Sequence, residues 1–175
     1  MIYFFRAISN ESDDFLFDIA INASAKFIDL HNFIQQKLNF DSAQLNSFFI
    51  TDEAWQKEQE ITLIDMTGDG SIGVMDQITL DTYLDRPKQR MLYTFDPFAE
   101  RILFMELTHI TEGEVKEPAA VRLEGTAPTP FLDENFDLDS DESESYDYDD
   151  GDDFSGLDDE FPEDYADDSF DFDDY

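Results

Sequence analysis

The sequence has no cysteine, only ten lysine and arginine residues, and no long apolar run. Without cysteine there are no disulfides, thiolate metal sites or cysteine nucleophiles. The N-terminal segment reaches acidic residues too early for a secretory signal, and no window approaches the roughly 18 apolar residues of a membrane-spanning helix. We therefore expect a soluble, cytoplasmic protein.

Acidic residues dominate the charge. The chain has 44 Asp and Glu residues and a formal net charge of −34, which disfavours direct contact with nucleic acid or anionic lipid. Residues 133–175 hold 22 of the acidic residues and no Lys or Arg, and Pro128 and Pro130 precede them. Ordering such a segment costs conformational entropy, and its few aliphatic side chains cannot bury enough apolar surface to offset that cost. Repulsion between the like charges adds to the cost. We predict a folded domain over 1–126, and a linker with a disordered acidic tail over 127–175.

The acidic tail also contains nine aromatic rings distributed along its length. They are Phe136, Tyr146, Tyr148, Phe154, Phe161, Tyr165, Phe170, Phe172 and Tyr175. Rings separated by carboxylates indicate either a solubilising tail or a segment that binds a basic or hydrophobic partner. Mimicry of nucleic acid fits poorly, because an extended tail carries about one charge per 6.5 Å, against one per roughly 1.7 Å of duplex DNA.

The first 126 residues combine strand patterns with one helical pattern. Phe27, Leu30, Ile34 and Leu38 recur at helical spacing after Ser24, which predicts an amphipathic helix of about 14 residues capped by Ser24. Other segments either alternate apolar and polar residues or are rich in β-branched and aromatic residues. They predict strands over 2–8, 15–21, 47–51, 61–66, 91–95, 102–108 and 120–124. Residues 78–84 fit a helical turn or a short strand. The order predicts an α+β fold, with a mostly antiparallel sheet and one main amphipathic helix after a ββα start.

Several motifs in this order resemble the Ri-plasmid ORF-three-like family of prokaryotic proteins. They are LHNFIQ at 30–35, Phe40, Phe48 and YTFD at 93–96, and the resemblance covers residues 1–112. It implies an α+β fold and no established activity, although some members have a transposon-resolvase-like label. A Phe-Gly-Asp run and a Trp typically follow in the family. Here those positions hold Pro97, Phe98, Ala99 and Arg101.

No catalytic, phosphate-binding or dinucleotide-binding fingerprint is present, and we expect no cofactor. His31 shares the apolar stripe of the predicted helix, which favours a half-buried structural histidine over a catalytic base. His109 follows a strand and has no second histidine near it in the sequence. Two isolated histidines do not make a metal site.

Residues 65–76, DMTGDGSIGVMD, match the template of a calcium-binding loop. The ligand positions fall on Asp65, Thr67, Asp69, Ser71 and Asp76. Three features argue against calcium binding. The preceding residues are predicted to form a strand, the last ligand is Asp76 where the template has the longer Glu, and an acidic chain produces such spacings by chance. A solvated acidic loop, which the family resemblance implies here, is the other interpretation.

Four of the ten basic residues cluster in the sequence at Arg86, Lys88, Arg90 and Arg101. They are either a solvated surface or a site where the acidic tail docks, in the same molecule or a neighbouring one. Exposed ion pairs of this kind contribute at most about 1 kcal/mol each and weaken with salt.

Three functional hypotheses remain. The favoured one is a non-enzymatic interaction protein whose acidic-aromatic tail gives solubility or binds a basic partner. The second is a nucleic-acid-transaction protein, as the resolvase-like label implies, although the charge disfavours direct contact. The third is a calcium-responsive module based on residues 65–76.

Overall fold

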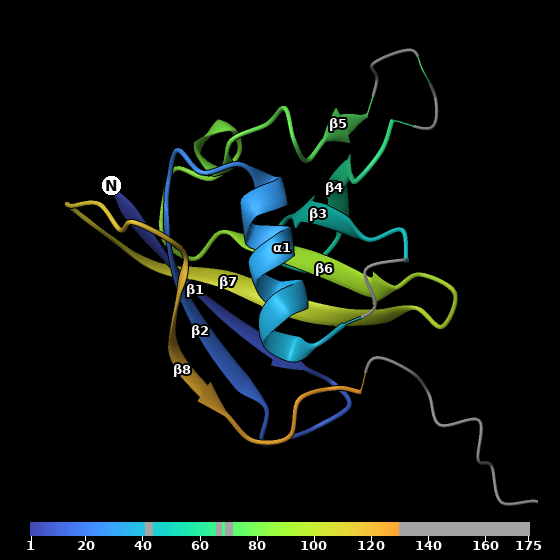
Figure 1. Ribbon diagram of the computed structural model, residues 1–175. Coiled ribbons are helices and arrows are strands. Elements are labelled where there is room, and N and C mark those ends of the chain that lie inside the picture. Colours follow the sequence, from blue (N-terminus) through green and yellow to red (C-terminus); the bar gives the residue numbers. More distant parts are fainter. Residues whose placement is uncertain (41–43, 66–67, 69–71, 130–175) are drawn as a thin grey trace, which may run out of the picture. The chain divides into compact units, whose positions relative to one another are not determined.

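The computed structural model describes residues 1–40, 44–65, 68 and 72–129. These residues form one eight-stranded sheet with one α-helix packed on it (Figure 1). The helix is α1 (Phe27–Leu38), and a single 3₁₀ turn, η1, spans Leu80–Thr82. The strands are β1 (Ile2–Ser9), β2 (Leu16–Asn22), β3 (Ser47–Thr51), β4 (Lys57–Thr62), β5 (Gly73–Val74), β6 (Arg90–Asp96), β7 (Arg101–Thr111) and β8 (Ala119–Glu124). In this part of the chain, no helix has the length and apolarity to cross a membrane.

The sheet order confirms the predicted fold class. The strands run β5-β4-β3-β6-β7-β1-β2-β8, and every neighbouring pair is antiparallel except β4 with β5. β1 lies between β2 and β7, so the start of the chain pairs with residues about a hundred positions later. The fold is therefore α+β with one helix. The predicted tail and its linker beyond residue 129 lie outside the described residues.

Alternate residues of the strands face α1, and we call this side of the sheet the inner face. Phe17 on β2 stacks with Phe33 of the helix, with ring centres 6.0 Å apart, and Phe48 on β3 contacts Phe27 at 5.4 Å. The alternation predicted for residues 15–21 is confirmed, since Phe15, Phe17, Ile19 and Ile21 are all buried. Each such side chain contributes about 1.5–3 kcal/mol on burial. The opposite side is called the outer face below.

The helix is where predicted, but its start was predicted wrongly. The N-cap is Lys26 and not Ser24, and the carboxylate of Asp29 accepts the Lys26 N–H at 2.9 Å. The next two helical N–H groups donate to the carbonyls of Ile78 and Met75, at 3.1 and 3.0 Å. A loop about fifty residues away thus satisfies the helix N-terminus, which sequence pattern alone cannot indicate.

Two other boundaries differ from the sequence prediction. The strand expected over 61–66 is β4, Lys57–Thr62, because pairing with β3 extends it through a polar segment of which only Ile61 is buried. Strand β5 was not predicted, since it has only two residues. It lies inside the calcium-loop template, and its Gly73 pairs with Ile61 of β4. Within 78–84 the helical alternative is correct, as the turn η1.

A close backbone approach at Gly125 supplies a test of how the folded domain ends. Gly125 has φ +73°, and a Cβ there would lie 2.1 Å from the carbonyl oxygen of Asp14. Gly68 also has a positive φ, +68°, but a Cβ there would meet nothing within 4 Å.

We predict that Gly125→Ala lowers the free energy of unfolding far more than Gly68→Ala. Both variants incur about 1 kcal/mol for a left-handed alanine, and only Gly125→Ala adds roughly 1–3 kcal/mol of overpacking. Urea unfolding measures the totals, and hydrogen exchange in β2 and β8 shows whether the loss is local. Equal effects of the two substitutions would contradict this packing.

Candidate functional site

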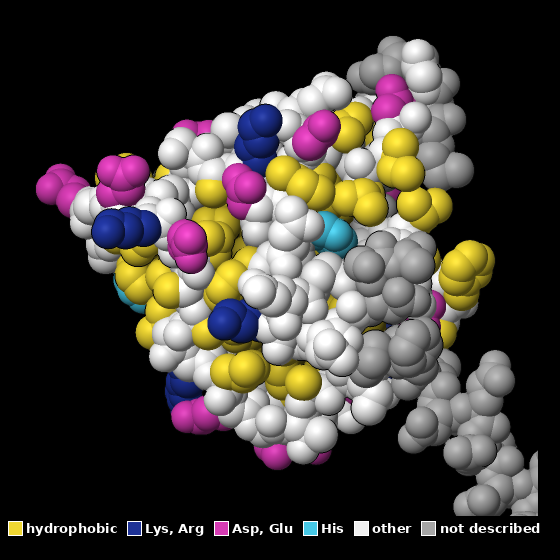
Figure 2. Space-filling model, in the orientation of Figure 1, with side chains coloured by type: hydrophobic (Ala, Val, Ile, Leu, Met, Phe, Trp, Pro, Cys, Tyr) yellow, Lys and Arg dark blue, Asp and Glu magenta, His cyan; other side chains and the backbone are white. Residues whose placement is uncertain are grey.

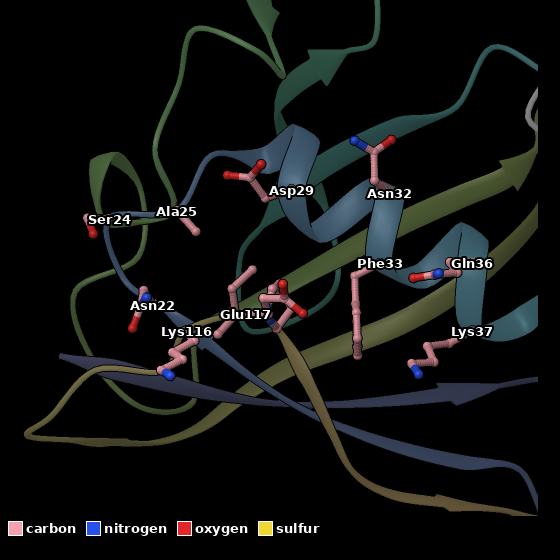
Figure 3. A pocket seen from close by; sticks show the side chains of 12 residues that line it. Asn22, Ser24, Ala25, Asp29, Asn32, Phe33, Gln36, Lys37, Lys116 and Glu117 are labelled. Carbon is pink, nitrogen blue, oxygen red and sulfur yellow. The ribbon is translucent and has the colours of Figure 1, made fainter.

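A groove of about 690 Å³ lies alongside α1. One wall is the helix, with Asp29, Asn32 and Lys37, and the other wall is the β7–β8 connection, with Lys116 and Glu117 (Figure 3). The two acidic and two basic groups are interspersed. A groove with both signs of charge suits a polypeptide segment better than a compact ion of one sign.

The far wall of the groove is held by a side chain that imitates backbone pairing. Asn22, at the end of β2, donates from Nδ2 to the Val115 carbonyl at 2.7 Å and accepts the Val115 N–H at 2.9 Å. This pair fixes the β7–β8 connection next to β2 and thereby positions Lys116 and Glu117. The two residues are 93 positions apart in the sequence.

The helix wall is built around Phe33. Its ring is 8% exposed, packs on Phe17 below, and has the ammonium of Lys37 5.6 Å from its centre. Figure 2 shows this side of the molecule, where hydrophobic side chains surface in separate groups and the charged ones are scattered. The groove therefore offers a ring edge and mixed charges without a large apolar patch.

A buried polar network lies on the opposite side of the same helix. The hydroxyl of Tyr93 accepts a hydrogen bond from Gln35 Nε2 at 2.7 Å and lies 2.9 Å from His31 Nδ1. Gln35 Nε2 also reaches Asn46 Oδ1 at 3.2 Å, and the Asn46 amide donates to the carbonyl of Phe95 at 2.9 Å. Because the Tyr93 oxygen accepts from Gln35, its own proton is available for His31 Nδ1.

Burial determines the protonation of this network. His31 is 4% exposed, and desolvation lowers its pKa from 6.5 to about 4, so the ring is neutral at pH 7. Desolvation raises the pKa of the fully buried Tyr93 well above its usual value. Neither residue lines the groove. His31 is hydrogen-bonded, as expected, but it is buried and not half-buried.

The second histidine is also engaged in packing. His109 stacks on Phe4 with ring centres 4.1 Å apart and planes 9° from parallel, and its Nδ1 lies 3.0 Å from Thr108 Oγ1. It is exposed near the end of β7, away from the network of His31.

The family motif at 93–96 leads into a corner held by an ion pair. Arg101 is only 6% exposed and binds Glu11 in two contacts of 2.7 and 2.6 Å, with its guanidinium 4.9 Å from the Phe95 ring centre. Donation of these hydrogen bonds to the Glu11 carboxylate raises the pKa of Arg101. Asp96 Oδ1 accepts the N–H groups of Phe98 and Ala99, each at 3.1 Å, and so caps the β6–β7 turn.

The four basic residues proposed to dock the tail are not in one place. Arg90 and Arg101 lie at opposite ends of the β6–β7 hairpin, since Arg90 pairs with Glu106 and Arg101 with Asp96. Arg86 and Lys88 lie in the exposed loop before β6, where Arg86 is 3.8 Å from Asp85. The docking of the tail on these residues stays a prediction.

The proposed calcium loop is only partly described. Asp65 accepts the Gly68 N–H at 2.9 Å, and Asp76 lies in the turn after β5. Thr67, Asp69 and Ser71 lie outside the described residues, so calcium binding stays a prediction.

The groove residues were not identified from the sequence. Lys37 and Lys116 have no motif around them, and the pairing of β2 with β8 is what brings residues near 22 and 116 together. Asn22 at the end of an apolar strand was the available signal, because a polar side chain there is a usual partner for loop backbone.

The neutral state of His31 predicts a specific pH dependence. The unfolded chain binds a proton near pH 6.5 and the folded chain only near 4, so the stability contributed by His31 is complete above pH 6.5 and is lost as pH falls towards 4. The loss is on the order of 3 kcal/mol. His31→Asn keeps an acceptor for Tyr93 and removes the titration.

We therefore expect the stability of His31→Asn relative to the native chain to rise as pH falls from 6.5 to 4, measured by urea unfolding. A difference that stays flat between pH 6.5 and 4 would contradict a buried neutral His31.

Comparisons with known proteins agree on the fold. The family model described as plasmid pRiA4b ORF-3-like protein matches residues 8–134, which extends beyond the expected resemblance and includes β8. The crystal structure of a protein of unknown function, MM3350, from Methanosarcina mazei Go1 is similar, with a TM-score of 0.59 and 17% identity. The similarity covers 73% of this chain and 71% of that one. No curated protein matches the sequence. The chain belongs to the plasmid pRiA4b ORF-3-like family.

Proposed function

We propose that this protein is a non-enzymatic, cytoplasmic interaction protein whose acidic, ring-bearing C-terminal segment binds a basic partner. The observation that carries the proposal is the composition of residues 133–175, with 22 carboxylates, nine aromatic rings and no basic residue. Carboxylates steer a basic partner, and rings supply contact area and specificity.

The described residues support a binding role over a catalytic one. Both histidines are used for packing, His31 inside the core and His109 against Phe4. Histidine is the most frequent general acid or base in catalysis, and neither histidine lines the groove along α1. The groove offers instead a ring edge and charges of both signs, which suit a peptide.

The charge also selects the partner class. Residues 1–132 carry a net charge of −12 and the remainder −22. Long-range attraction is therefore strongest for a basic protein and is repulsive for nucleic acid. The groove gives a second contact surface on the folded domain for the same partner.

The test is a pull-down with the full-length chain and two full-length variants. In one variant serine replaces all nine tail rings and the charge is unchanged. In the other, amides replace alternate tail carboxylates and the rings are unchanged. We expect a basic protein, identified by mass spectrometry, to be retained by the native chain and lost with either variant.

Two outcomes contradict the proposal. Capture of the same proteins by all three chains shows that the tail does not select the partner. Recovery of DNA or RNA that persists in the ring variant supports a nucleic-acid-transaction protein instead.

A further inference from the structure

An unbroken row of apolar side chains crosses the outer face of the sheet. The register pairs Phe49 with Leu92, Leu92 with Phe104, Phe104 with Ile8, and Ile8 with Leu16, on β3, β6, β7, β1 and β2. We call these five residues the apolar row. Each alternates along its strand with residues of the inner face, so none of them faces α1.

A row of charges of alternating sign runs beside the apolar row. Two residues along each strand, the register pairs Arg90 with Glu106, Glu106 with Arg6, and Arg6 with Asp18. Arg90 Nε lies 3.1 Å from Glu106, and Arg6 binds Asp18 in two contacts of 2.8 and 2.9 Å. We call these four residues the charged row.

Four members of the apolar row are accessible. Ile8 is 44% exposed, and Phe49, Phe104 and Leu16 are half-buried, whereas Leu92 is 4% exposed. The half-buried ring of Trp55, from the β3–β4 turn, meets Phe104, the middle residue of the row, edge-on at 5.1 Å and adds its own apolar surface there. A group of accessible apolar side chains on a sheet surface is the kind of feature that marks a binding face.

We propose that the outer face is the interface of a twofold-symmetric dimer of this chain. The twofold axis lies in the interface, along the strands, between β7 and β1. Rotation by 180° about this axis places each row against the same row of the second copy, with the order of the strands reversed. Phe104, with the ring of Trp55 against it, then meets Ile8 of the second copy, and the buried Leu92 lies opposite Leu16 of the second copy.

Charge complementarity singles out a second copy as the occupant. In reversed order, Arg90 lies opposite Asp18 of the second copy, and Glu106 lies opposite Arg6 of the second copy. All four facing pairs of the two charged rows therefore have opposite signs. Sheets that pack face to face in this way interleave their side chains about 10 Å apart.

The size and charge of the interface make the dimer reversible and salt-dependent. Five strands span roughly 24 Å at about 4.8 Å each, which is a small interface by the standard of permanent complexes. Two chains of −34 also repel each other at long range. Salt screens this repulsion over about 8 Å at physiological ionic strength and about 30 Å at 0.01 M, so the dimer strengthens as salt is raised.

Sedimentation velocity of the full-length chain at low and high protein concentration, in low and physiological salt, tests the proposal. We expect a monomer–dimer equilibrium that shifts to dimer with concentration and with salt. Ile8→Glu, next to the axis, should give a monomer in every condition. Ile64→Glu makes the same change at a residue that is 54% exposed and lies after β4, off the apolar row, and should behave as the native chain.

The remaining outcomes each overturn the proposal. They are a native chain that stays monomeric at high concentration and physiological salt, a dimer that survives Ile8→Glu, and a dimer lost equally with Ile64→Glu. Association that weakens as salt rises identifies an acidic segment as the occupant of the outer face instead. Circular dichroism melts of both variants confirm that they are folded before the comparison.

Discussion

The hydroxyl of Tyr93 joins the helix to the sheet, and the packing of the two depends on its hydrogen bonds. It is fully buried at the centre of the inner face, accepts from Gln35 at 2.7 Å and lies 2.9 Å from His31, while its ring packs 4.7 Å from Phe48. A buried polar group without partners costs about 1–3 kcal/mol. The network therefore fixes which turn of α1 lies over β6, a choice that apolar packing alone specifies weakly.

This arrangement assigns different roles to the two sides of the helix. The inner side holds His31 as a neutral acceptor, and the other side lines the groove with Asp29, Asn32 and Lys37. The outer face of the sheet is the side that does not face the helix. His31 is thus held inside the core, whereas the groove carries charged groups of both signs and the outer face carries the apolar row and the charged row.

Residue patterns predicted the elements that rest on local periodicity. The helical stripe from Phe27 to Leu38 and the apolar alternation of residues 15–21 are both buried as expected. Patterns failed where a distant segment decides the outcome. Lys26 is the N-cap because a loop supplies the missing acceptors, and β5 exists only through its pairing with Ile61.

The candidate site was less predictable than the fold for the same reason. Arg101 lies eleven residues after Arg90, yet it is buried against Glu11, which is 90 positions away. The groove likewise needs the contact of Asn22 with Val115, and the outer-face rows need the registers of five strands. Spacing along the chain carries no information on such contacts, whereas it carries much on which side of a helix or strand is buried.

The free energy of unfolding of Tyr93→Phe at neutral pH tests most directly whether this node holds the fold together. The account predicts a loss of about 1–3 kcal/mol, because Gln35 and His31 lose their shared partner inside the core. Tyr83→Phe, the same change at a half-buried ring, should cost far less. If the two substitutions have the same effect, the helix is held by apolar packing alone and the account is wrong.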